Sequence, residues 1–312
     1  MFRLALFSVL AGSTLRALAQ GPAAGAQIDQ ARQFSSPVAP LDLPTPLLGA
    51  TQIPEATAAP DDAFGAQVIF KRVVRPTPFT AFAEVSAFFT NNVALARRDT
   101  LDDKFLVIAA GAGYSRPVGF DLRFEMSVRA SLYRYAEYRE LDFQSVDVSA
   151  GVVWSPPALH GTEVALRYLF TDLTAAESQD EIYRNHAVLL GVQKVIPFSA
   201  AHAAYFGASG QWSWSDPAEP GRDEYVAFAG YHMDATRHIG ADLSYRYGYF
   251  VYREADGRQD QNHTFSLTLR YAPVEWFAIS ANSFLGINRS NRSAFDYELW
   301  NAGVGLQFSL KF

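Results

Sequence analysis

The chain has 312 residues, of which 49% are hydrophobic and 19% are charged, and its formal net charge is −6 at pH 7. This acidic balance argues against a nucleic-acid partner, which needs a basic surface. The absence of cysteine excludes disulfides, thiolate metal sites and a lipid-modified cysteine. After the N-terminus no run of about 18 uncharged apolar residues occurs, which excludes helical membrane spans.

The first 19 residues are predicted to be a secretory signal peptide. Arg3 lies in a short basic region, an apolar segment follows over residues 4–12, and Ala17 and Ala19 form a small-x-small cleavage site. The apolar segment is too short to span a bilayer as a helix. We expect cleavage after Ala19, with a cut after Ala26 as the alternative, and export of the remaining chain.

Residues 20–78 are predicted to be a flexible periplasmic segment. Nine of the 16 prolines lie here, in stretches such as SSPVAPLDLPTPLLGA and PEATAAPDD. Proline lacks a backbone N–H, so a segment this rich in it is not expected to sustain a helix or a central strand. We therefore expect an extended tail without a chemical site, followed by one domain over residues 79–312.

From residue 79 onward, apolar and polar residues alternate with a period of two, which is the pattern of β-strands with one apolar and one polar face. The clearest case runs from Phe120 to Leu132. The chain ends in the same way, with Phe308, Leu310 and Phe312 on one face. The predicted strands cover residues 79–90, 104–114, 120–135, 143–154, 162–171, 185–196, 201–214, 225–233, 241–252, 263–272, 276–287 and 297–312.

Charged residues are confined to one face of the six clearest strands, and the apolar faces carry none. A soluble β-sandwich also alternates in this way. The signal peptide, the strand lengths, the 14% aromatic content and the terminal phenylalanine together favour apolar faces that contact lipid and polar faces that line a lumen. The predicted fold class is all-β, a transmembrane, antiparallel, up-and-down barrel of about twelve strands.

The connections between the predicted strands alternate in length. One set is long and charged, as in NNVALARRDTLDD, and the other is mostly short, as in SRPVG and APVE. Outer-membrane barrels have short periplasmic turns and longer outer loops, so an even strand number places both termini in the periplasm. Tryptophans at both ends of the strands predict two aromatic belts at the membrane interfaces. The outer belt would contain Trp212, Trp214 and Trp300, and the periplasmic belt Trp154 and Trp276.

The alternating last strand with Phe312 at its end resembles the C-terminal signal of bacterial outer-membrane β-barrel proteins, which usually end in Phe. The resemblance covers the signal peptide and residues from about 79 to 312, and it identifies an architecture rather than one function. It implies general secretory export, recognition by the barrel-assembly machinery, and a Gram-negative-type outer membrane with its lipid and lipopolysaccharide. Phe308, Leu310 and Phe312 would carry the assembly signal.

The sequence does not indicate a catalytic site. The outer-membrane phospholipases and lipid A deacylases use His-x-Ser, and the outer-membrane aspartyl-type proteases have an Asp-His pair; neither pattern occurs at any of the six histidines. His232 and Asp234 share a strand face, but two ligands without a third make a weak metal site. We predict no enzyme, no metal site and no cofactor.

Six acidic and six basic residues fall on the predicted lumen faces, Lys311 included. Opposed charges could flank a narrow water-filled channel, or could pair and fill a closed structural barrel whose acidic loops bind surface partners. Twelve strands lie between filled eight-stranded barrels and open porins, so size does not decide. We favour a monomeric, weakly selective, passive diffusion channel for small hydrophilic solutes. Its predicted pore-lining residues are Glu84, Asp121, Arg123, Glu125, Arg129, Asp147, Glu163, Arg167, Asp242, Arg246 and Arg270.

Overall fold

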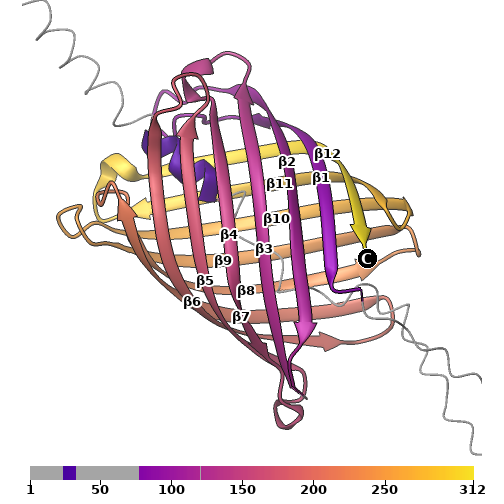
Figure 1. Cartoon of the computed structure of the whole chain (residues 1–312). Coiled ribbons are helices and arrows are strands. Elements are labelled where there is room, and N and C mark those ends of the chain that lie inside the picture. The colour runs from indigo at the N-terminus through magenta and orange to yellow at the C-terminus, as the bar shows by residue number, and fades with distance from the viewer. Residues whose placement is uncertain (1–23, 33–76, 120) are drawn as a thin grey trace, which may run out of the picture.

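Twelve antiparallel strands form a closed barrel in the computed structural model, which describes residues 24–32, 77–119 and 121–312 (Figure 1). Each strand pairs with its neighbours in the chain, and the last pairs with the first. Short 3-10 turns η1 (Arg139–Leu141), η2 (Pro157–Leu159) and η3 (Ser293–Phe295) lie in three connections. The strands are β1 (Phe79–Thr90), β2 (Asp103–Pro117), β3 (Leu122–Tyr135), β4 (Phe143–Trp154), β5 (Thr162–Ala175), β6 (Glu181–Pro197), β7 (His202–Asp216), β8 (Arg222–Asp234), β9 (Ile239–Tyr252), β10 (Gln259–Val274), β11 (Phe277–Ser290) and β12 (Tyr297–Lys311).

The predicted twelve-stranded barrel is confirmed, and β1 and β4 have the predicted bounds. Several other strands are longer than predicted. β6 begins at Glu181 instead of residue 185, and β10 begins at Gln259 instead of residue 263. Backbone pairing continues past the apolar band into charged residues that resemble a loop in the sequence. β3, in contrast, is shorter than predicted. Asp121 was predicted to lie on this strand and lies in the turn before it.

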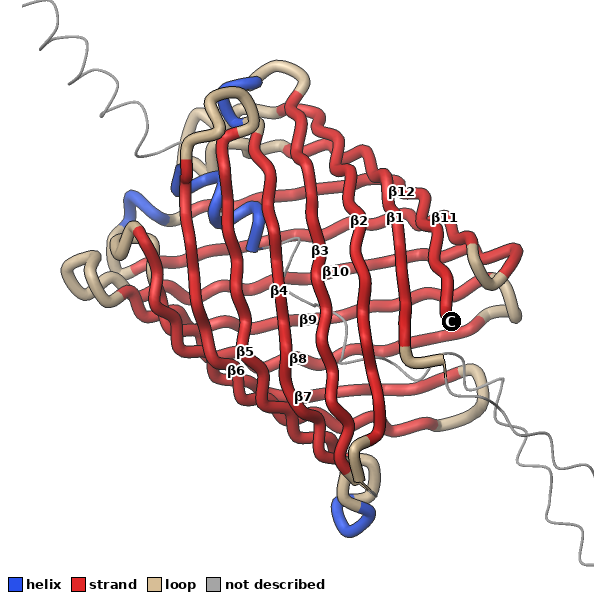
Figure 2. The backbone as a smooth tube through the Cα atoms, in the orientation of Figure 1, coloured by secondary structure: helices blue, strands red, loops and turns tan. Residues whose placement is uncertain are grey.

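The two ends of the barrel differ in the length of their connections (Figure 2). We call the end with residues 118–121, 155–161, 198–201, 235–238 and 275–276 the short-turn end, and the end with residues 91–102, 136–142, 176–180, 217–221, 253–258 and 291–296 the long-loop end. β1 begins and β12 ends at the short-turn end. The alternation of connection length expected from the sequence is therefore present, most clearly in the connection between β1 and β2.

The first and last strands close the barrel through a continuous ladder. Phe79 N–H donates to the Phe312 carbonyl at 3.0 Å, Phe312 N–H donates to the Phe79 carbonyl at 3.0 Å, and the two rings stack with centroids 5.8 Å apart. Because each of the twelve described strands has two neighbours, none of them leaves a row of backbone groups unpaired at a sheet edge. This closure is what a sheet needs in order to cross hydrocarbon.

The outward face of the barrel is apolar. Along the C-terminal strand Val304, Leu306, Phe308, Leu310 and Phe312 are each between 44% and 63% exposed. A closed barrel with an apolar exterior and a charged interior is a transmembrane barrel. Trp154 and Trp276 lie near the short-turn end, and Trp212, Trp214 and Trp300 lie near the long-loop end. Among the described residues, no helix is long and apolar enough to span a membrane.

Gly151 in β4 is required by the close approach of β5. A Cβ atom at this position would lie 2.2 Å from the Leu166 carbonyl oxygen and 2.7 Å from the Arg167 Cα. We expect Gly151→Ala to lower the free energy of unfolding by about 1–3 kcal/mol, because backbone atoms must shift. The urea midpoint of the refolded barrel measures this. Gly113→Ala is the matched control, since its nearest neighbour would be 3.8 Å away. An equal loss in both variants would contradict the packing argument.

Residues 24–32 form a helix inside the barrel near the long-loop end, drawn in indigo in Figure 1. The expectation of an extended tail without a helix therefore does not hold for these residues. The stretch AGAQIDQAR contains no proline, so the argument from proline content did not apply to it. A helix this short is marginal by itself and needs packing to persist. The predicted signal peptide and the tail residues 20–23 and 33–76 lie outside the described residues.

Candidate functional site

The candidate site is the contact between helix 24–32 and the inner wall of the barrel at the long-loop end. Ile28 and Ala31 are both 2% exposed and belong to one apolar cluster with wall residues from β1 to β6 and from the connections between them. Aromatic rings build much of this wall, and Tyr133 stacks on Phe143 with centroids 4.1 Å apart. The wall residues are Phe88, Val93, Phe105, Val107, Tyr133, Tyr135, Leu141, Phe143, Leu173 and Tyr183.

Gln30 anchors the helix to the same wall with both ends of its amide. Its Nε2 donates to the Val93 carbonyl in the connection between β1 and β2 at 2.9 Å. Its Oε1 accepts a hydrogen bond from the Tyr135 hydroxyl at the end of β3. A buried amide left without partners costs free energy, so both bonds favour the docked position of the helix.

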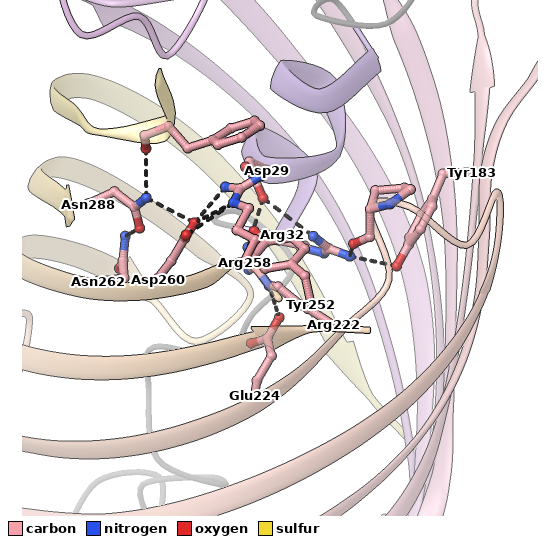
Figure 3. Close-up of polar contacts among 12 residues, drawn as sticks. Asp29, Arg32, Tyr183, Arg222, Glu224, Tyr252, Arg258, Asp260, Asn262 and Asn288 are labelled. Carbon is pink, nitrogen blue, oxygen red and sulfur yellow. Dashed lines mark hydrogen bonds and ion pairs between the residues drawn. The ribbon is translucent and has the colours of Figure 1, made fainter. Parts of the chain in front are cut away.

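Asp29 and Arg32 hold the adjacent side of the helix to β6 and β8 (Figure 3). Arg32 Nη2 donates to the Tyr183 hydroxyl at 2.6 Å and to the Pro220 carbonyl at 2.8 Å. Asp29 Oδ1 accepts from Arg222 Nη1 at 2.9 Å and lies 3.4 Å from Arg32 Nη1. The Asp29 carboxylate is therefore placed between two guanidinium groups, one from the helix and one from the wall.

Arg222, at the start of β8, is oriented by the barrel as well as by the helix. Its Nε donates to Glu224 Oε1 at 2.9 Å, its Nη1 donates to the Tyr252 hydroxyl at 2.8 Å, and its guanidinium lies 3.8 Å from the ring centroid of Phe250. Glu224 also lies 3.4 Å from Arg246 Nη2 in β9. Glu224 thus joins the buried Arg222 to the half-buried Arg246, with 9% of its own side chain exposed.

A second ion pair, between Arg258 and Asp260, lies in the same wall. Arg258 Nη2 lies 2.5 Å from Asp260 Oδ2, and its guanidinium is sandwiched between the rings of Tyr252 at 4.0 Å and Phe295 at 3.6 Å. Asn288 Nδ2 donates to the same Asp260 oxygen at 3.1 Å. The fork geometry of arginine suits carboxylates, and its plane suits aromatic faces, so both features are used here.

A small cavity lies where the helix meets β8, β9, β10 and β12. Counted with Glu224, which pairs with two of the lining arginines, its charged residues are three arginines and two acids, a formal sum of +1. The remaining lining is two aromatic rings and an amide. The lining residues are Asp29, Arg32, Arg222, Arg246, Phe250, Asn262 and Tyr297.

The predicted pore-lining residues of β1, β3, β4 and β5 come together on one wall of the lumen. Arg129 reaches across β2 to Glu84 at 3.5 Å. Glu125 accepts from Arg123 Nε at 2.6 Å and also from Arg167 in β5. The other acids of this wall are satisfied as well: Asp147 accepts from Thr171 Oγ1 at 2.8 Å, and Glu163 accepts from Gln193 Nε2 at 2.9 Å.

The other predicted pore-lining residues do not join this wall. Arg246 belongs to the cluster around Arg222, and Arg270 is exposed near the short-turn end of β10. Asp242 accepts from the Tyr205 hydroxyl at 2.8 Å and lies 3.7 Å from His232, whose other ring nitrogen is 3.4 Å from Asp234. Within the described residues no group of three or more histidines and acids is arranged to hold a metal ion.

No protein-family model matches the chain, and no curated protein matches its sequence. Among solved structures, the COG4313 outer membrane channel from Pseudomonas putida F1 superposes with a TM-score of 0.53 at 10% identity, covering 76% of this chain and 97% of that one. The chain has the fold of an outer-membrane β-barrel. The outer membrane channel DcaP of Acinetobacter baumannii (TM-score 0.44, 9% identity, 74% and 96% covered) and the KdgM porin (0.41, 8%, 73% and 99%) are also similar.

Several residues of this outer-membrane barrel that form the candidate site were missed in the sequence. Helix 24–32 is not predicted because prolines are frequent in the residues around it. The stretches SDPAEPGRDE and READGRQDQN have the composition of loops, and they contain Arg222, Glu224, Arg258 and Asp260. One signal was present. In each pair a basic and an acidic residue are two positions apart, which places both on one face if the strand continues. These stretches are rich in charged residues, which is typical of loops, and the prediction of loops followed that composition instead of the two-residue spacing.

Proposed function

We propose that this barrel is a passive, weakly selective diffusion channel of the outer membrane for small hydrophilic solutes, partly closed at its long-loop end by helix 24–32. The observation that carries the proposal is the state of the charges on the inner wall. The side chains of Arg123, Arg129 and Glu84 remain 30%, 28% and 25% exposed although they form ion pairs. A lumen packed with side chains would bury them, so we infer water-filled space beside these pairs.

The near balance of charge on the same wall supports weak selectivity. Four acids, Glu84, Glu125, Asp147 and Glu163, are interleaved with three arginines, Arg123, Arg129 and Arg167. Ladders of opposed charge order water across a narrow pore and screen solutes by size and polarity instead of by the sign of their charge. The similarity in fold to an outer membrane channel agrees with transport, and it concerns the fold alone.

Orientation and assembly are part of the proposal. Long loops of outer-membrane barrels face outward, which would place both ends of the barrel domain in the periplasm and helix 24–32 just beneath the outer surface. Phe308, Leu310 and Phe312 lie on the outward face of the last strand, where the assembly machinery could bind them. Because the barrel closes on its own strands, one chain can span the membrane among lipid and lipopolysaccharide, and the proposed working unit is a monomer.

The proposal includes no catalytic step. Three histidines share a hydrogen bond with a tyrosine hydroxyl on the outward face of the barrel, with distances of 2.6 to 2.8 Å. Such pairs are cross-strand contacts at the lipid surface, away from the lumen. They are Tyr168 with His186, Tyr231 with His202, and Tyr245 with His263.

A closed structural barrel is the second candidate, and the docked helix is the observation that favours it. Recording single-channel currents of the refolded, signal-free chain in planar bilayers separates the two functions. A channel gives discrete, ohmic steps and a reversal potential near zero in asymmetric KCl. Silence from protein that is shown to be folded and inserted would contradict the channel and favour the structural barrel.

The lumen arginines provide a prediction about selectivity. Replacing Arg123 and Arg129 with glutamine removes two positive charges from the wall and is expected to raise the cation-to-anion permeability ratio by about two- to tenfold. Reversal potentials in asymmetric KCl measure this ratio. Arg289→Gln is the control, because Arg289 is 49% exposed and pairs with Glu298, which is 65% exposed, outside the lumen. An unchanged ratio combined with an unstable barrel would mean that these charges are structural.

A further inference from the structure

The cavity at the long-loop end already holds a carboxylate, that of Asp29. This group receives Arg222 Nη1 at 2.9 Å and lies 3.4 Å from Arg32 Nη1. Of these partners only Arg222 belongs to the barrel. The barrel therefore presents an arginine whose Nε pairs with the barrel's own Glu224, while the carboxylate on its Nη1 comes from a separate segment of the chain.

Three contacts of Arg222 come from the barrel itself and do not involve the helix. Glu224 fixes its Nε at 2.9 Å, Tyr252 accepts from its Nη1 at 2.8 Å, and Phe250 supports its face at 3.8 Å. With the helix docked, 7% of its side chain is exposed, so Asp29 occupies the side of Arg222 that the barrel leaves open. A guanidinium in this state binds carboxylates strongly, because the bond is charge-assisted and the geometry is already set.

The charge around the cavity also favours an anion. Without the helix, Arg222 and Arg246 face a single acid, Glu224, which leaves an excess of one positive charge. The rest of the barrel lining offers the rings of Phe250 and Tyr297 and the amide of Asn262. Rings and an amide beside two arginines suit an organic carboxylate, whose carbon skeleton can contact the rings while its oxygens meet the guanidinium.

We propose that this cavity binds solutes that carry a carboxylate, and that Asp29 occupies the site as an internal competitor while helix 24–32 is docked. The inference rests on the proposed channel function and names its class of solute. A solute carboxylate and Asp29 cannot bind Arg222 Nη1 together. Since the solute binds only when the helix has moved, it shifts the population toward the undocked helix and the open mouth.

The test uses the full signal-free chain in planar bilayers with KCl, and succinate as the probe. Succinamide, in which amides replace both carboxylates, is the matched neutral compound. We expect succinate to raise the open fraction of single channels and succinamide to leave it unchanged. Asp29→Asn should lower the succinate concentration for half effect about tenfold, because the internal competitor loses its charge. Asp256→Asn is the control, since that acid is in the same end of the barrel and 88% exposed.

A second variant locates the site. Arg246 lines the cavity, and its ion pair is with Glu224 in the wall. Arg246→Gln should weaken succinate binding about tenfold without removing the contacts that hold the helix. Titration calorimetry of succinate into detergent-solubilised Asp29→Asn protein measures binding independently of any current. The heat-modified mobility of each variant in electrophoresis shows that its barrel is folded.

The outcomes separate this inference from the channel proposal. Steps that respond equally to succinate and succinamide, or an Arg246→Gln variant that binds succinate normally, would overturn the carboxylate site and leave the channel standing. Calorimetric binding without any steps would support the site and contradict the channel. If sulfate and phosphate act as strongly as succinate, the site is a general anion site and the carboxylate class is wrong.

Discussion

Replacing Ile28 with alanine is expected to raise the ratio of open to closed channels by about 30- to 1,000-fold. Ile28 is 2% exposed and packs in the apolar cluster of the wall. Truncating a buried isoleucine costs about 2–4 kcal/mol. The cost falls on the docked helix alone, because in the undocked state the side chain is in water, and each 1.4 kcal/mol changes a population ratio about tenfold. The open fraction of single channels measures the effect.

Gly25→Ala is the matched control on the same helix. A Cβ atom at Gly25 would meet no other atom within 4 Å, so the substitution adds no clash. Alanine favours a helix over glycine by about 0.5–1 kcal/mol, and the variant should therefore close the channel about two- to fivefold more tightly. Effects of the same sign in both variants, or no effect of Ile28→Ala on a conducting protein, would mean that the helix does not block the mouth.

Replacing Glu224 with glutamine is expected to lower the free energy of unfolding of the barrel by about 3–5 kcal/mol. Glu224 joins Arg222 at 2.9 Å to Arg246 at 3.4 Å, and only 9% of its side chain is exposed. Glutamine keeps the shape but leaves a buried guanidinium group, that of Arg222, and a half-buried one, that of Arg246, without their shared carboxylate. Removing one partner of a buried ion pair has this large effect because the remaining charge is far from water. Urea unfolding of the refolded protein measures it.

Glu298→Gln separates this effect from the loss of any acid. Glu298 pairs with Arg289 as Glu224 pairs with Arg222, but it is 65% exposed. Exposed ion pairs contribute less than about 1 kcal/mol, so the urea midpoint should hardly move. If the two variants lose the same stability, burial is not what makes the Glu224 cluster important. In that case Arg222 and Arg246 have more contact with water than their burial in the structure indicates.

The helix docks because its two kinds of contact fall on adjacent faces. Ile28 and Ala31 are three residues apart, and so are Asp29 and Arg32, so each pair shares a face, with one rotated by about 100° from the other. The first face meets the apolar wall of β1 to β6, and the second meets the polar residues of β6 and β8. Apolar burial gives the helix its stability in the lumen, and the ion pair makes that position sensitive to a competing anion.

The strands were predictable because the information that specifies them is local. A period of two in residues such as Phe308, Leu310 and Phe312 states which face meets lipid, and it does so without reference to any partner. The number of strands, their alternation of faces and the closure of β12 on β1 followed from that pattern and from the parity of the connections. Strand ends were less predictable, because pairing at Glu181 and Gln259 depends on the neighbouring strand.

Local alternation along the chain is enough to specify the barrel, its apolar exterior and part of its charged interior. Which charges meet depends on the folded barrel: Glu84 pairs with Arg129 across an intervening strand, and Asp29 pairs with Arg222, 193 residues further along the chain. Helix 24–32 also depends on contacts between residues that are far apart in the chain. Its nine residues lack the length to be stable alone, so its existence depends on a wall that forms only when the barrel closes. Local periodicity carries no record of such long-range contacts.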